Sequence, residues 1–93
     1  MIAVFHAKRP TFGFGPAGNF PGDFDHVADV DLPDEDHSGV FRLTNHIGQP
    51  WWENPRVELI TESRSTSVGD IIRLSDGRLL LCQNLGWSEV PCV

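Results

Sequence analysis

Apolar and polar residues alternate along much of this chain, and a period of two predicts β-strands. The opening MIAVFHA predicts a first strand, and FDHVADVDL predicts a second one that is half-buried, with its acids in water. The second pattern is imperfect, because His26 falls on the apolar face and Val27 on the acidic one. The two predicted faces carry Phe24, Ala28, Val30 and Leu32 on one side, and Asp25, Asp29 and Asp31 on the other.

The next segment, LPDEDHSGVFRLTNHIGQP, has the signals of a helix of about three turns. Acids at its start favour the positive end of a helix dipole, and Asp34 or Asp36 can cap it. Gly48 suits the position after the last turn, and Pro50 forbids continuation. One packing stripe follows the helical period: Val40, Leu43, Thr44 and Ile47.

The second half of the chain reads as strands and turns. WWENP is a connector, VELIT a short strand and RSTSVGD a turn. IIRLS and RLLLCQN flank Asp76-Gly77, which predicts a β-hairpin because glycine adopts positive φ at low cost. The apolar run from Leu79 to Cys82 predicts a strand inside the sheet, and GWSEV predicts a last short strand.

These elements predict an α+β fold in a single small domain over residues 1–93. A twisted, mainly antiparallel sheet of about five or six strands packs against one helix, and residues 10–22 form a Gly/Pro-rich loop. The formal charge of −6 disfavours direct contact with nucleic acid or anionic membrane. Without a secretion signal or a long apolar run, the sequence predicts a cytoplasmic protein with reduced Cys82 and Cys92.

No set of residues has the spacing of a catalytic or metal site. Gly13-x-Gly15-x-x-Gly18 matches a dinucleotide fingerprint formally, but the surrounding prolines exclude the helix that such a site needs. His6, His26, His37 and His46 are widely spaced, so neither a metal nor a cofactor is predicted. A hydrolase drawn from Ser65, Ser67, Asp70 and a histidine lacks a nucleophile elbow.

Two segments carry the candidate binding residues. In RSTSVGD, the hydroxyls can fix a tight turn and Asp70 can accept from turn amides or pair with Arg64. In WWEN, adjacent tryptophans in an extended segment point to opposite sides, so one is expected to be buried and the other, with Trp52 favoured, partly exposed. Either segment is structural or a binding surface, and the candidate set is Trp51, Trp52, Glu53, Asn54, Arg64, Ser65, Ser67 and Asp70.

The segments FRLTNHI, WWEN, RSTSVGDII and DGRLLLCQNLGW, together with VADVDL, resemble small uncharacterised proteins of plasmids, phages and other bacterial mobile elements. The half RSTSVGDII…DG…C…GW also resembles the YodL-like domain of such elements. The resemblance covers roughly residues 24–91 and excludes the loop from Pro10 to Gly22. It implies a small accessory protein that regulates a host or element protein, with no catalytic residue or cofactor to transfer.

Three functions remain open at this point. The first is a non-enzymatic protein-binding module with a protein partner, in which a homodimer is also allowed. The second is an inhibitor that imitates DNA, which requires the acids of residues 23–36 to share one surface. The third is a small-ligand binder or enzyme, which requires a concave, partly apolar pocket.

Overall fold

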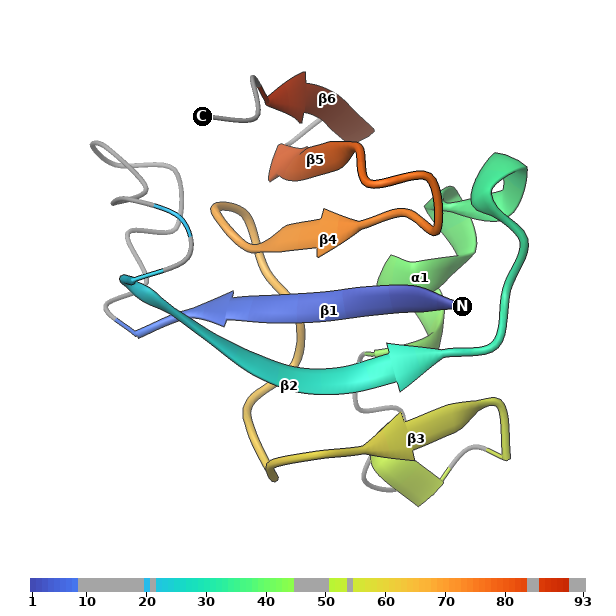
Figure 1. Cartoon of the computed structure of the whole chain (residues 1–93). Helices are drawn as coiled ribbons and strands as arrows, with labels where there is room; N and C mark the ends of the chain where they lie inside the picture. Colours follow the sequence, from blue (N-terminus) through green and yellow to red (C-terminus); the bar gives the residue numbers. More distant parts are fainter. Residues whose placement is uncertain (9–19, 21, 45–50, 54, 84–85, 91–93) are drawn as a thin grey trace.

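The computed structural model describes residues 1–8, 20, 22–44, 51–53, 55–83 and 86–90, and it contains one six-stranded sheet. Every strand pairs antiparallel with its neighbours, in the order β3-β2-β1-β4-β5-β6 (Figure 1). The predicted antiparallel sheet is confirmed. The strands are β1 (Ile2–Ala7), β2 (Phe24–Val30), β3 (Val57–Leu59), β4 (Ile71–Arg73), β5 (Leu79–Gln83) and β6 (Gly86–Val90).

Strand β1 lies inside the sheet and is buried along its whole length. Its alternate side chains divide the core in two. Ile2 and Val4 belong to the cluster on the face that also contacts the helical segments, here called the helix-side face. Ala3 and Phe5 belong to a second cluster on the opposite face. A strand with apolar residues on both faces must be internal, which is why β1 is flanked by β2 and β4.

Strand β2 contains a β-bulge that the alternation pattern does not reveal. Val4 lies opposite Ala28, but Phe5 lies opposite His26, so Val27 is an extra residue in the ladder. Such a bulge reverses the faces of all residues on one side of it. It explains why two neighbours, Val27 and Ala28, are both buried on the helix-side face.

The predicted faces of β2 are therefore wrong before the bulge. Phe24 packs in the cluster of the opposite face, whereas Val30 packs on the helix-side face. Asp25 lies opposite His6 and Asp29 lies opposite Ala3, so these two acids are on different faces of the sheet.

Helix is scarce in this fold. The 3-10 turn η1 (Asp34–Asp36) leads into α1 (Ser38–Leu43), and a second 3-10 turn is η2 (Trp51–Glu53). The predicted continuous helix of three turns is thus shorter and broken at His37, while Ile47, Gly48 and Pro50 lie outside the described residues. Val40 and Thr44 of the predicted stripe are fully buried.

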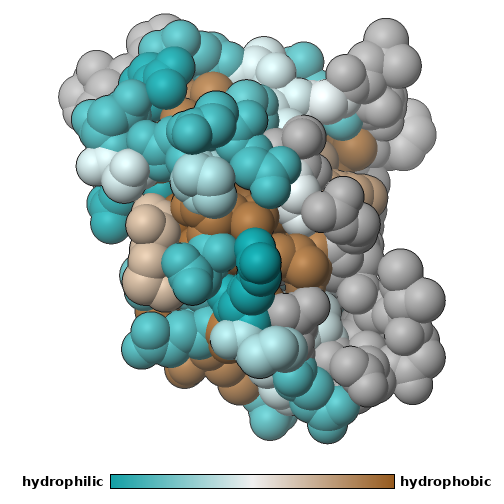
Figure 2. Space-filling model, turned by 90° about the vertical axis from the view of Figure 1, so that its right-hand side faces the viewer, coloured by the Kyte–Doolittle hydropathy of each residue, from teal (hydrophilic) through white to brown (hydrophobic). Residues whose placement is uncertain are grey.

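The short helix α1 lies at one end of the sheet, at the surface of the molecule (Figure 1). Figure 2 shows this end of the molecule, where hydrophobic surface lies between hydrophilic regions. Phe41 of α1 is 42% exposed and Met1 is 55% exposed. No helix within the described part of the chain is long and apolar enough to cross a membrane.

The predicted hairpin of β4 and β5 is confirmed, and β5 is internal as expected. Its loop is longer than the two-residue turn that Asp76-Gly77 favours. Leu74 pairs with Arg78, and the Gly77 amide donates to the Leu74 carbonyl at 3.0 Å. Gly77 has φ +96°, a left-handed value that glycine supplies in three-residue hairpin loops.

Replacing Gly77 by alanine should destabilise the fold by about 1–2 kcal/mol, because the added Cβ meets no atom within 4 Å but forces a strained φ. Gly22→Ala is the matched control, since its Cβ also has open space and no positive φ is present. Urea unfolding of both variants measures the difference, and equal stabilities would contradict this explanation.

Candidate functional site

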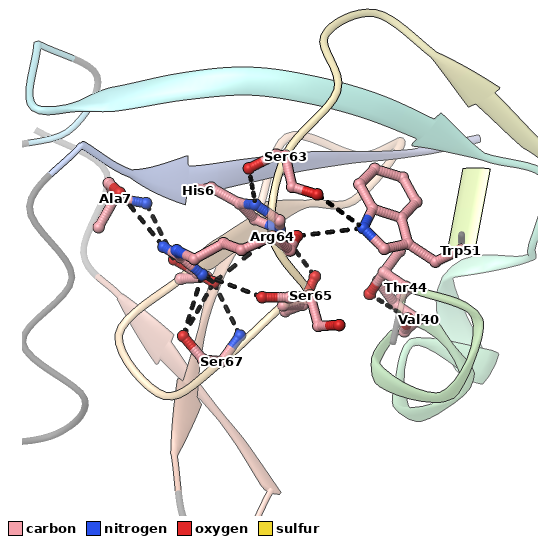
Figure 3. A network of polar contacts seen from close by, with 11 residues as sticks. His6, Ala7, Val40, Thr44, Trp51, Ser63, Arg64, Ser65 and Ser67 are labelled. Atoms are coloured by element: carbon pink, nitrogen blue, oxygen red, sulfur yellow. Dashed lines mark hydrogen bonds and ion pairs between the residues drawn. The ribbon is translucent and has the colours of Figure 1, made fainter. Parts of the chain in front are cut away.

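The segment from Ser63 to Asp70 connects β3 to β4, and its polar side chains gather around the end of β1 (Figure 3). The Thr66 amide donates to the Thr44 carbonyl at 2.9 Å, which fixes the segment to the end of α1. The residues of the predicted RSTSVGD turn therefore lie beside β1, a strand from the opposite end of the sequence (Figure 3).

Asp70 is the most demanding group in this arrangement, because it is fully buried and carries a carboxylate. Arg64 binds it with two parallel hydrogen bonds of 2.7 and 2.8 Å. The Ala7 amide donates to Oδ1 at 2.9 Å and the Ser67 amide to Oδ2 at 2.8 Å. A buried charge is tolerated only when it is paired and hydrogen-bonded in this way. Both predicted roles of Asp70, accepting from a turn amide and pairing with Arg64, are confirmed.

Arg64 uses its remaining donor capacity on the same segment. Its guanidinium donates to the Ala7 carbonyl at 3.2 Å, to Ser67 Oγ at 3.0 Å and to the Ser65 carbonyl at 3.1 Å. Its side chain is 29% exposed, against 1% for Asp70. Arg64 therefore covers the carboxylate from the solvent side and ties the turn to the end of β1.

The backbone of Asp70 extends this connection to β5. The Cys82 amide donates to the Asp70 carbonyl at 2.8 Å, and the Gly69 amide donates to the Cys82 carbonyl at 3.0 Å. Gly69 has φ +99°, a left-handed conformation that glycine adopts at low cost. Asp70 thus joins β1 and the connecting segment through its carboxylate, and β5 through its backbone.

His6 is a second buried polar group, and the sequence offered no direct sign of its role. Its Nδ1 is 2.9 Å from Ser63 Oγ and its Nε2 is 2.8 Å from Thr66 Oγ1. Burial lowers the pKa of His6 from 6.5 to about 4, although Asp70 Oδ2 lies 3.9 Å away and opposes this shift. The sequence signal that could have revealed this role is strand alternation, which puts His6 on the same buried face as Ile2 and Val4. A buried imidazole on such a face needs hydrogen-bond partners.

The contacts of His6 invite comparison with a hydrolase, but their geometry differs from a catalytic triad. Thr66 is 2% exposed, so no substrate reaches its hydroxyl. Ser63 is half-buried, yet an imidazole with a pKa of about 4 is a weak base near neutral pH. The nearby carboxylate of Asp70 is held by Arg64 rather than by the ring. The polar groups of these five residues, here called the clamp, contact one another: His6, Ser63, Arg64, Thr66 and Asp70.

The paired tryptophans lie in η2, which is a 3-10 turn, so the expected extended segment is wrong. The expected difference in burial is confirmed: Trp51 is 3% exposed, while Trp52 is partly exposed. The Trp51 indole N–H donates to the carbonyls of Ser63 and Arg64 at 3.3 and 3.1 Å. The Trp52 ring meets Trp51 edge-on at 5.3 Å. Trp51 thereby anchors Trp52 and the exposed Glu53 to the clamp, and Asn54 lies outside the described residues.

Three of the acids of residues 23–36 have separate local partners. Lys8 Nζ is 3.8 Å from Asp25, and His26 Nε2 is 2.8 Å from Asp29. Asp34 accepts from the amide and the hydroxyl of Ser75, both at 2.8 Å, and these bonds lower the pKa of its carboxyl. The acids therefore serve different parts of the surface.

No group of three potential metal ligands occurs among the residues that the structure describes. Cys82 is a buried free thiol, and burial raises its pKa to about 11, in keeping with a small core residue. Cys92 and His46 lie outside the described residues.

Comparison with models of protein families, with curated proteins and with solved structures finds no match to this chain.

Removing the guanidinium should be far more harmful than removing the neighbouring hydroxyl. Arg64→Ala leaves Asp70 buried without its charge partner and should lower the unfolding free energy by about 3–5 kcal/mol. Ser67→Ala keeps the carboxylate paired and should cost about 1 kcal/mol. Chemical denaturation of the two variants tests this order, and similar losses would show that the ion pair is not the dominant contact.

The protein should also become less stable as the pH is lowered, because protonation of His6 favours the unfolded chain. The unfolded chain binds a proton near pH 6.5 and the folded chain only near pH 4, so stability is complete above 6.5 and is lost as the pH drops toward 4. The loss should reach about 3 kcal/mol. Urea unfolding between pH 7.5 and 4.5 measures it, and His6→Gln should flatten the slope. An unchanged slope in that variant would assign the effect to other groups.

Proposed function

We propose that this protein is a small, acidic, non-enzymatic module that binds and regulates another protein. The observation that carries the proposal is the pair Trp52 and Glu53 on η2. A partly exposed indole beside an exposed carboxylate is held on a turn that the buried Trp51 fixes to the clamp. Rigid aromatic side chains of this kind provide much of the binding energy at protein interfaces, because little entropy is lost on binding.

The contacts of the RSTSVGD segment support a role without catalysis. Its arginine and carboxylate bind each other, and the Ser67 hydroxyl bonds the same pair. These groups hold β1 and β4 together. Among the predicted binding residues, the proposal therefore gives the contact role to Trp52 and Glu53 and a supporting role to Trp51, Arg64, Ser67 and Asp70.

The origin in a mobile genetic element is part of this proposal and depends on the motif RSTSVGDII with the following DG and GW. In the structure, residues of this motif contact one another. Arg64, Ser67 and Asp70 form one network, and Trp87 lies opposite Cys82, whose amide bonds Asp70. Sequencing of the genes on either side tests the origin directly.

The imitation of DNA has less support. It requires the acids to share one surface, but Asp25 and Asp29 lie on different faces of the sheet. Each also lies beside a basic or imidazole side chain, Lys8 or His26. The positions of these acids therefore do not favour DNA imitation over protein binding through η2. They also do not favour a small-ligand site or an enzymatic reaction.

Trp52→Ala should weaken binding to the partner by about tenfold or more, which corresponds to 1.4 kcal/mol. Because Trp52 is only partly buried against the core, the melting temperature should fall less than in Trp51→Ala. The partner is first captured from the host with the wild-type chain, identified by mass spectrometry and purified for calorimetry. Phe41→Ala is the matched control, because it removes an exposed aromatic ring from α1 instead of η2.

Trp51→Ala should instead destabilise the fold by about 3–5 kcal/mol. Equal affinity of the wild-type chain and the Trp52→Ala variant would overturn the role of η2. Failure to find any partner at micromolar concentration would count against the protein-binding function itself.

A further inference from the structure

Strand β6 ends the sheet, and the described part of the chain places no strand on its outer side (Figure 1). All five residues of β6 pair with β5 on the inner side. A free strand edge offers unpaired N–H and C=O groups to another chain, so natural proteins usually shorten or charge such edges. β6 carries a single charged residue, Glu89.

The hydrogen bonds of β5 show which groups of β6 point outward. The Cys82 amide donates toward β4, to Asp70, and the Cys82 carbonyl accepts from Gly69 on the same side. Cys82 therefore forms a pair without mutual hydrogen bonds with the residue opposite on β6, which is Trp87. Alternation in an antiparallel ladder gives the same result for Leu80 and Glu89. The backbone groups of Trp87 and Glu89 consequently face the outer edge.

We propose that β6 pairs with β6 of a second copy of this chain, antiparallel, about a twofold axis through Ser88. This register places Trp87 of each copy opposite Glu89 of the other. These are the two residues whose backbone groups face outward, so the pair forms four hydrogen bonds and extends the sheet across both copies. Ser88 lies opposite its own equivalent.

Other twofold registers are poorer. Residues directly opposite in a sheet lie on one face, so the axis must pass through a residue rather than between two. An axis at Glu89 would set two carboxylates against each other and would ask for the amide of Pro91, which has none. An axis at Trp87 forms only the two bonds of the Trp87 pair within β6.

The side chains of β6 fit the register through Ser88. Trp87 packs partly against the core of the helix-side face, and the two Trp87 residues become diagonal neighbours within reach of aromatic rings. On the opposite face, Val90 is also partly buried and meets Gly86 of the other copy.

The other edge strand, β3, is unsuited to the same association. Arg56 and Ile60 direct backbone groups toward β2, so the outward groups belong to Val57 and Leu59. The corresponding twofold register sets Glu58 against Glu58, and like charges directly opposite each other are unfavourable. The strand is also only three residues long. The difference between the two edges predicts a dimer through β6 and not an open chain of copies.

Sedimentation equilibrium of the whole chain should reveal a monomer–dimer equilibrium that tightens with salt, since each copy carries a formal charge of −6. Glu89→Pro removes an outward amide but no bond to β5, and it should weaken the dimer by about tenfold or more. Glu89→Gln is the matched control and should dimerise at least as well as the wild type. A wild type that stays monomeric at ~0.5 mM overturns the proposal, as does unchanged association of Glu89→Pro.

The register has its own test in a Cys92→Ser background. Ser88→Cys places two thiols directly opposite across the axis, with Cα atoms about 4.5 Å apart, a distance that a disulfide accepts. Glu89→Cys places each thiol opposite Trp87 instead. Mild oxidation should cross-link the first variant and not the second, and the reverse result would overturn this register. The Trp52→Ala variant should dimerise normally, so loss of partner binding and loss of the dimer are separable.

Discussion

The buried carboxylate of Asp70 is the constraint on which the rest of this structure depends. A charge removed from water must be matched by donors, and here they come from two places. The end of β1 supplies the Ala7 amide, and the connecting segment supplies the Ser67 amide and the Arg64 guanidinium. Each donor is useful only if all the segments are in place. The hydrogen bond from the Ala7 amide to this carboxylate joins residues sixty-three positions apart, so β1 and the connecting segment must come together for the charge to be matched.

The same connecting segment meets the needs of His6. An imidazole on the helix-side face of a fully buried strand would be costly without partners, and Ser63 and Thr66 supply them. The polar residues of this segment bond to side chains and backbone of β1. Their density resembles that of an active site because burying polar groups requires the same close hydrogen bonding that catalysis does. Next to this segment, η2 carries the partly exposed Trp52 and the exposed Glu53.

The sheet treats its two edges differently. β3 is short and has a carboxylate at its centre, whereas β6 is longer and has Ser88 at its centre. Strand length and charge placement together make the β3 edge resistant to self-association and the β6 edge receptive to it. The outer edge of β6 is thus a second proposed contact surface, separate from η2.

The sequence by itself determined the strands, because alternation, apolar runs and Gly77 are local signals, and it also marked Asp70 with Arg64 and the unequal burial of the tryptophans. Tertiary structure decided the strand order, the partners of His6 and the faces of the acids. The bulge at Val27 explains this limit: one extra residue reverses which side a strand presents, and only the pairing with β1 shows where it lies. The helix was overestimated for a related reason. The helical pattern over residues 34–47 reports only local propensity. In the structure α1 ends at Leu43, and the carbonyl of the next residue, Thr44, accepts a hydrogen bond from the amide of the distant Thr66.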